Sequence, residues 1–171
     1  PPSNSISSLD TDLKGNVWIG GYNANGIAHY GIEGWTHYET KVLWPEYKES
    51  FRDGMFVEAS PNGFAWVVKK EFDWLKVSND GNIERYPSKL SPEGLYIFVD
   101  SNERIWYISN GTEVGYVDYS NNEWVVFSEL PSTVLMAGPT FVESPEGDVW
   151  LVLPNDSDGE AGLYKYTPSK E

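Results

Sequence analysis

The chain has 171 residues, of which 26 are acidic and 12 basic, so its formal net charge at pH 7 is -14. Such a charge repels phosphate backbones and anionic lipid surfaces, and we expect no nucleic acid among the partners. The absence of cysteine excludes disulfides and a thiol nucleophile. No apolar run approaches the roughly 18 residues of a membrane span, so we expect no membrane insertion.

Four copies of a strand–turn–strand pattern follow one another, each with a tryptophan in its second strand. The clearest copy runs from Asp10 to Gly20, where residues 14–16 form the turn and an apolar-aromatic run follows. The repeated tryptophans lie 48, 40 and 44 residues apart and are Trp18, Trp66, Trp106 and Trp150. A period of about 40 to 50 residues is typical of β-propellers.

In chain order, the first copy predicts strands at 6–9, 17–20, 26–30 and 35–38, joined by short turns. The second copy begins near Phe56 and predicts strands at 66–68, 74–77 and 83–86. After a strand near Phe98, the third predicts 105–108, 115–119 and 124–127. The fourth begins near Phe141, predicts strands at 149–152 and 162–166, and has no outermost strand.

We therefore predict an all-β fold: a β-propeller, or a propeller segment, of about four blades that are each a four-stranded antiparallel meander. The prediction is a single domain or fragment over 1–171, with repeats at roughly 6–40, 55–89, 95–129 and 139–167. Small propellers close by sharing a blade between the two chain ends. Since the leader before Ile6 is short and polar, we expect an excerpt from a longer propeller, with a closed four-bladed ring as the alternative.

The tryptophans at the repeated position are candidates for a ring that stacks on sugars, but their constant place favours packing in the core. Trp35 and Trp124 occupy matching outer-strand positions, and we expect them to be buried in the same way. The only histidines are His29 and His37, eight residues apart across a turn. Neither has an obvious nucleophile or a three-ligand metal set beside it in the sequence.

The repeat resembles that of the two-component regulator propeller family, whose units run from Asp through Gly-Asn, an aliphatic residue, Trp, another aliphatic residue and Gly. Residues 12–20, followed by Gly26-Ile27 and Tyr30, match this pattern closely. Residues 146–151, with the later Gly162-Leu163 and Tyr166, match it in part.

The second and third copies match this family mainly at the turn and the tryptophan, and Glu103 stands where glycine is usual. The resemblance implies a propeller of the kind found in the extracytoplasmic sensing half of bacterial membrane-bound sensor kinases, and in some secreted enzymes and binding proteins. It supplies structural residues and no catalytic set.

The longest link between copies, residues 40–55, mixes aromatic and charged side chains. Loops of this size often carry binding function, whereas packing over the blade ends is the alternative. The candidate ligand-binding residues in this link are Trp44, Tyr47, Phe51, Arg52 and Asp53.

The densest cluster of oxygen ligands is the acidic segment 155–160. Ca²⁺ takes six to eight oxygens, and Asp156, Asp158 and Glu160 could supply several of them, although the spacing is not that of an EF-hand. A solvated acidic turn is the simpler interpretation. We therefore predict no cofactor, with calcium at these three residues as the alternative.

The function predicted from these features is a non-enzymatic, extracytoplasmic propeller module that binds or senses a ligand or a protein, in the periplasm or outside the cell, as part of a larger bacterial protein. A small molecule, a glycan or a protein are its candidate partners. A propeller-type lyase or hydrolase with a divalent metal is one alternative. The other is a structural repeat in a surface assembly, which self-associates through an open blade edge.

Overall fold

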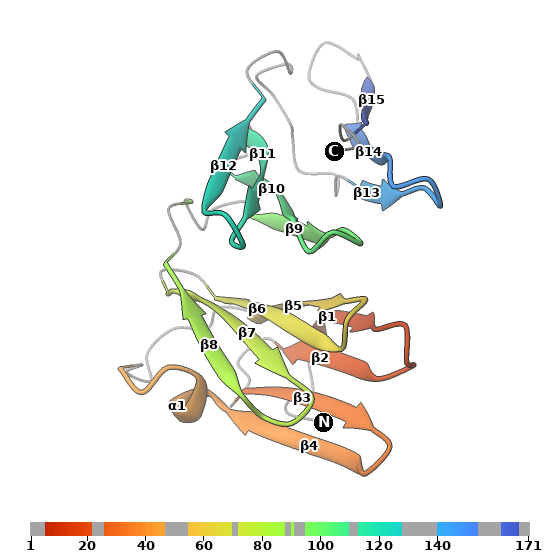
Figure 1. Cartoon of the computed structure of the whole chain (residues 1–171). Coiled ribbons are helices and arrows are strands. Elements are labelled where there is room, and N and C mark those ends of the chain that lie inside the picture. The colour runs from red at the N-terminus through yellow and green to blue at the C-terminus, as the bar shows by residue number, and fades with distance from the viewer. Residues whose placement is uncertain are drawn as a thin grey trace. The chain divides into compact units, whose positions relative to one another are not determined.

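The computed structural model describes residues 6–21, 26–46, 55–69, 72–87, 90, 95–109, 113–127, 140–153 and 162–167. Their fifteen strands form four antiparallel sheets, each with its strands in chain order (Figure 1). The prediction of an all-β fold made of propeller blades is confirmed. Among these residues, no helix is long and apolar enough to cross a membrane.

Two sheets occupy the first half of the chain. The first sheet consists of β1 (Ile6–Thr11), β2 (Val17–Gly21), β3 (Gly26–Gly31) and β4 (Gly34–Glu39). A single helical turn, α1 (Thr40–Leu43), follows it and was not predicted. The second sheet consists of β5 (Met55–Ser60), β6 (Phe64–Lys69), β7 (Trp74–Ser78) and β8 (Ile83–Tyr86).

The second half of the chain holds the other two sheets. The third sheet consists of β9 (Tyr96–Val99), β10 (Ile105–Ser109), β11 (Glu113–Asp118) and β12 (Glu123–Val126). The fourth consists of β13 (Thr140–Glu143), β14 (Val149–Leu153) and β15 (Gly162–Tyr166). Over the residues that the structure describes, this last sheet has three strands, as the sequence pattern predicted.

The chain divides into two compact units, residues 1–89 and residues 90–171, each containing two sheets. The core of the first unit is a continuous cluster that includes Trp18, Trp44, Val57 and Leu75, all at most 2% exposed. In the second unit the buried side chains include Trp106, Ile108 and Leu151.

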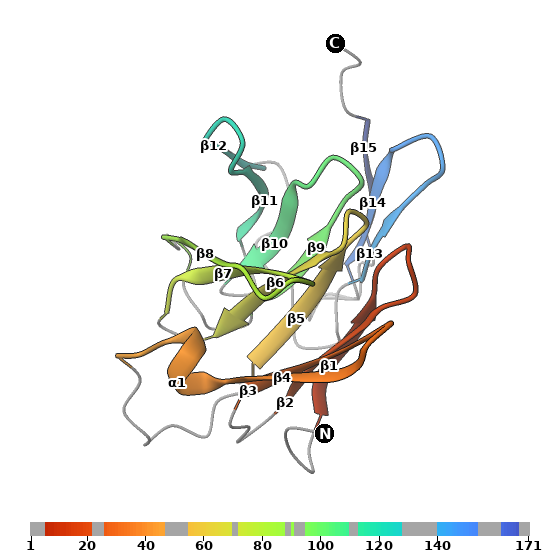
Figure 2. The same cartoon turned by 60° about the horizontal axis from the view of Figure 1, so that its bottom comes forward.

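Within the first unit, polar side chains of β1 join the first sheet to the second. The backbone N–H of Val57 donates to Ser8 Oγ at 2.7 Å, and that of Ala59 donates to Asp10 Oδ2 at 2.7 Å. Ser8 and Asp10 are two residues apart in β1, so their side chains point to the same side of the strand. This side is turned to β5, which runs beside β1 (Figure 2). These bonds satisfy backbone N–H groups of β5 that point away from β6, the only strand with which β5 pairs in its sheet.

The repeated tryptophans pack as expected in the first three copies: Trp18, Trp66 and Trp106 are at most 3% exposed. A ring of stacking platforms for sugars would need exposed faces, which these three side chains lack. The expectation for Trp35 is wrong, because this side chain is 60% exposed on the outer strand β4. It packs instead against Tyr30, its cross-strand neighbour, with ring centroids 5.0 Å apart and ring planes tilted by 49°.

Candidate functional site

One turn recurs at the same place in all four sheets and positions the residues of the site. Its first residue is Asp12, Ser60, Asp100 or Ser144, and the side chain of each accepts backbone N–H bonds from residues two or four positions ahead. This side-chain bonding is how Asp and Ser stabilise tight turns. The turn thus fixes the backbone of the residue four positions after its first residue, and with it the direction in which that side chain points.

At two positions that follow this turn in the chain, the residue type differs from copy to copy. The first is the fourth residue after the turn begins, occupied by Asn16, Phe64, Arg104 and Asp148. The second lies opposite the repeated tryptophan on the following strand, occupied by His29, Lys76, Tyr116 and Lys165. The first position precedes the tryptophan by two residues, so both positions share one face of each sheet.

In residues 90–171 these two positions line a groove of about 1000 Å³. Arg104 precedes β10 and Tyr116 lies on β11 of the third sheet, whereas Asp148 precedes β14 and Lys165 lies on β15 of the fourth. The turn residues and strand ends around them add polar side chains, among them Asn102, Asp118, Asn121, Glu123, Glu146 and Tyr166. A volume of this size is in the range of sites for small molecules.

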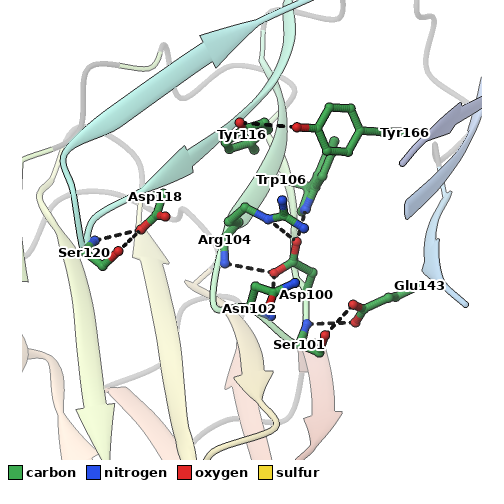
Figure 3. A network of polar contacts seen from close by, with 10 residues as sticks. All are labelled: Asp100, Ser101, Asn102, Arg104, Trp106, Tyr116, Asp118, Ser120, Glu143 and Tyr166. Atoms are coloured by element: carbon green, nitrogen blue, oxygen red, sulfur yellow. Dashed lines mark hydrogen bonds and ion pairs between the residues drawn. The ribbon is translucent and has the colours of Figure 1, made fainter. Parts of the chain in front are cut away.

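A buried carboxylate, Asp100, organises one wall of this groove (Figure 3). It is fully buried and accepts four hydrogen bonds: from the backbone N–H of Asn102 and Arg104, from Arg104 Nε at 2.6 Å and from Trp106 Nε1 at 2.7 Å. A carboxylate buried with this many donors holds them rigidly, because losing one leaves a charge uncompensated. Asp100 therefore fixes the position of the Arg104 guanidinium.

The Arg104 guanidinium lies among aromatic rings. Its central carbon is 5.4 Å from the ring centroid of Tyr116 and 5.7 Å from those of Trp106 and Tyr166. The Nη2 atom is buried and has no hydrogen-bond partner among the described residues. The Nη1 atom makes no hydrogen bond to the described residues and is not among the fully buried atoms, so it retains donors that a bound molecule can use.

The two tyrosines meet above Arg104 in the view of Figure 3, where their hydroxyl oxygens lie 3.4 Å apart and share a hydrogen bond. Burial raises the pKa of Tyr116, and the hydrogen bond to Tyr166 and the negative charge of Glu123 raise it further. Tyr116 therefore stays protonated and can act as a donor or an acceptor at neutral pH.

The rim of the groove is mainly acidic. Lys165 Nζ pairs with Asp148 Oδ2 at 2.6 Å, so these two charges offset each other. Asp118 accepts bonds from the backbone N–H and the hydroxyl of Ser120. With Arg104 paired to Asp100, the carboxylates of Asp118, Glu123 and Glu146 have no ion pair with a described cation, and the groove carries a net negative charge.

Of the five residues predicted from the sequence to bind a ligand, the structure describes only Trp44. Trp44 is fully buried in the first unit, and its indole N–H donates to the carbonyl oxygen of Asp73 at 3.0 Å. The other four residues predicted to bind a ligand, Tyr47, Phe51, Arg52 and Asp53, fall outside the described part of the chain. The ligand-binding prediction for this link therefore stays a prediction.

The three residues predicted for calcium, Asp156, Asp158 and Glu160, also lie outside the described residues. Within those that are described, no group of three or more His, Asp or Glu side chains could hold a metal ion. The two histidines do not converge: His29 is opposite Thr36 and His37 is opposite Ala28, so they project from opposite faces of the first sheet.

The groove is not apparent from the residues that the four copies share. The signal lay in their differences: at two aligned positions the third and fourth copies place Arg104, Tyr116, Asp148 and Lys165, where the first two place other residues. Aligning the copies on the turn and the tryptophan would have found these four. The Asp100–Arg104 pair is visible in the same way, since Asn16 follows Asp12 at the same spacing.

Comparison with known families and with curated proteins gives no match. Solved structures do match in fold. A catalytically inactive variant of virginiamycin B lyase from Staphylococcus aureus superimposes with a TM-score of 0.64 at 18% identity, over 100% of this chain and 59% of that one. The extracellular domain of a putative hybrid two-component system from Bacteroides thetaiotaomicron gives 0.61 at 15% identity, over 100% and 24%.

An auxiliary nutrient binding protein from Bacteroides thetaiotaomicron gives a TM-score of 0.58 at 10% identity, over 96% of this chain and 42% of that one. The chain thus spans about three fifths of the length of the lyase and less of the other two. At these identities the likeness shows the fold alone, since one fold hosts many functions.

Proposed function

We propose that this chain is a binding module of the propeller type and that the groove in residues 90–171 takes a small polar ligand. The observation that carries the proposal is Arg104, held by a buried carboxylate while its Nη1 atom keeps unused donors at the groove. Rigid polar groups with unused hydrogen-bonding capacity are typical of ligand sites, because preorganisation lowers the cost of binding.

The cellular setting is part of the same proposal. Likeness in fold to extracellular domains of putative hybrid two-component systems supports an extracytoplasmic location, periplasmic or extracellular, within a larger bacterial protein. It also supports a sensing role of the kind that the repeat resemblance implies. A protein partner and self-association through a blade edge remain proposals, as do calcium at residues 155–160 and the absence of any required cofactor.

The lyase alternative draws on likeness in fold to structures of virginiamycin B lyase and streptogramin B lyase. No observation within the described residues specifically favours it, whereas the groove specifically favours binding. Turnover of a candidate substrate by the purified chain, lost on substitution of groove residues, would reverse this order.

The test is a thermal-shift screen of small polar metabolites against the unchanged protein and a variant with the groove filled. Asn102→Trp places a large side chain at an exposed turn position on the groove, while its backbone bond to Asp100 is kept. The matched control is Asn62→Trp, at the equivalent turn position of the second copy. A ligand at about 100 times its Kd stabilises the folded state by about 2.7 kcal/mol.

We expect a compound that raises the Tm of the unchanged protein and of Asn62→Trp, and leaves that of Asn102→Trp unchanged. Equal shifts in all three proteins would show that the ligand binds elsewhere, and the proposal for this groove would be abandoned. A screen without any shift for the unchanged protein would count against binding of small polar molecules altogether.

A further inference from the structure

The geometry points to Arg104 as the donor that anchors a neutral, hydroxyl-rich ligand, a short saccharide, in the groove of residues 90–171. This inference rests on the proposed binding function and adds the chemical class of the ligand. It is derived from the charges and the unused donors of the described residues.

An anionic ligand fits the groove poorly. The two cations of the lining, Arg104 and Lys165, are each already paired with a carboxylate, Asp100 and Asp148. The further carboxylates Asp118, Glu123 and Glu146 repel a negative charge placed among them. An anion would therefore gain no net attraction from the lining even though an arginine is present, because both cations are already neutralised and the further carboxylates oppose it, if only weakly.

A purely cationic ligand also fits incompletely. The rim carboxylates are solvated, with Glu123 and Glu146 exposed and Asp118 half-buried, so their attraction for a cation is weak and is screened by salt. A cation brings donors and no acceptor, so it leaves Arg104 Nη1 without a partner and adds repulsion from the guanidinium. Donors that a ligand leaves without partners in a partly buried site lower its affinity.

A hydroxyl group resolves both difficulties because it accepts one hydrogen bond while donating another. Neighbouring hydroxyls can accept from Arg104 Nη1 and donate to rim carboxylates such as Asp118, while the amides of Asn102 and Asn121 can do both. The faces of Trp106 and Tyr116 already pack around the guanidinium, so hydrogen bonding, more than ring stacking, would hold the sugar.

The chain itself offers the variant that tests Arg104. In the first copy Asn16 occupies the position of Arg104, and its Nδ2 donates to Asp12 Oδ2 at 2.6 Å, just as Arg104 Nε donates to Asp100. Arg104→Asn is therefore expected to satisfy the buried carboxylate and to fold, while it removes the terminal donors from the groove. Arg85→Asn, which removes an arginine that pairs with Glu46 in the first unit, is the matched control.

The experiment is calorimetric titration of the whole chain with three matched sets of probes: neutral di- and trisaccharides of glucose, galactose and mannose, oligomers of galacturonic acid, and oligomers of glucosamine. We expect at least one neutral saccharide to bind more tightly than its charged counterparts. Arg104→Asn should weaken that binding about tenfold or more, as expected for loss of a charged hydrogen bond, and Arg85→Asn should leave it unchanged. Circular dichroism and the Tm of Arg104→Asn verify that it is folded.

The outcomes separate the ligand class from the proposed function. Tighter binding of the glucosamine or galacturonic acid oligomers, blocked by Asn102→Trp, would overturn the neutral-ligand inference and keep the groove as a binding site. Saccharide binding that survives Arg104→Asn in a folded protein would overturn the role of Arg104. Binding that survives Asn102→Trp, or no binding in any set together with an empty metabolite screen, would overturn the proposed function as well.

Discussion

At the scale of single residues, the buried His29 is the clearest source of pH dependence. It is 5% exposed, its ring centroid lies 4.3 Å from that of Trp18, and its Nε2 atom has no hydrogen-bond partner within the described chain. Burial lowers the pKa of His29 below its usual value of 6.5, and the negative charge of Asp12 opposes this only in part. The folded protein therefore binds a proton at His29 less readily than the unfolded chain does.

The sign of the effect on stability follows from this difference. Since the unfolded chain takes up the proton first, the contribution of neutral His29 is complete above pH 6.5 and is lost as the pH falls toward the folded pKa. We expect the urea midpoint of the unchanged protein to fall more between pH 7.5 and pH 5 than that of His29→Gln. His37→Gln, at an exposed position, should behave like the unchanged protein. Equal pH dependence in His29→Gln and the unchanged protein would contradict the prediction.

At the scale of elements, the recurring turn has glycine at one position in every copy except the third. The residue three positions after the turn begins has a positive φ in every copy, and it is glycine in three of them: Gly15, Gly63 and Gly147. The third copy has Glu103 there, with φ 62°. A side chain in this left-handed conformation costs about 1 kcal/mol.

Glu103→Gly should therefore stabilise the protein by up to about 0.5 kcal/mol, because the relief of about 1 kcal/mol of backbone strain exceeds the free-energy cost of the added freedom of the unfolded chain. The reverse change is Gly15→Ala, where an added Cβ would meet no heavy atom within 4 Å. The expected change in stability therefore comes only from the strain of a left-handed backbone conformation. Gly15→Ala should destabilise the protein by about 1 kcal/mol. Urea denaturation measures both variants, and a loss of stability in Glu103→Gly would show that side-chain contacts of Glu103 outweigh the strain.

The strands were predictable from the sequence because turn residues and the repeated tryptophan mark them locally. Predicted strands at 17–20 and 26–30 became β2 and β3 with one further residue each. The exposure of Trp35 was not predictable, because an outer strand has no neighbour on one side and its burial depends on what packs there. The residues that the copies share did not predict the groove either, because its walls come from two sheets that lie about 40 residues apart in the sequence.

At the scale of the whole molecule, charge and groove chemistry point the same way. The chain carries 26 acidic against 12 basic residues, and the groove has three carboxylates without an ion pair to a described cation. Long-range repulsion and local repulsion therefore both act against a polyanion. Long-range repulsion reaches farthest at low salt, where the Debye length is about 30 Å at 0.01 M against about 8 Å at 0.15 M.

We accordingly expect the protein to pass through a heparin column at pH 7.5 without retention, in 0.01 M and in 0.15 M salt alike. Fluorescence anisotropy of a labelled single-stranded DNA should show no binding under the same conditions, since few cations are present to displace counterions. Retention on a quaternary-ammonium resin is the positive control for the net charge. Heparin binding at low salt that disappears as salt rises would contradict the prediction, because it requires a concentrated basic patch on a chain whose lysines and arginines are few.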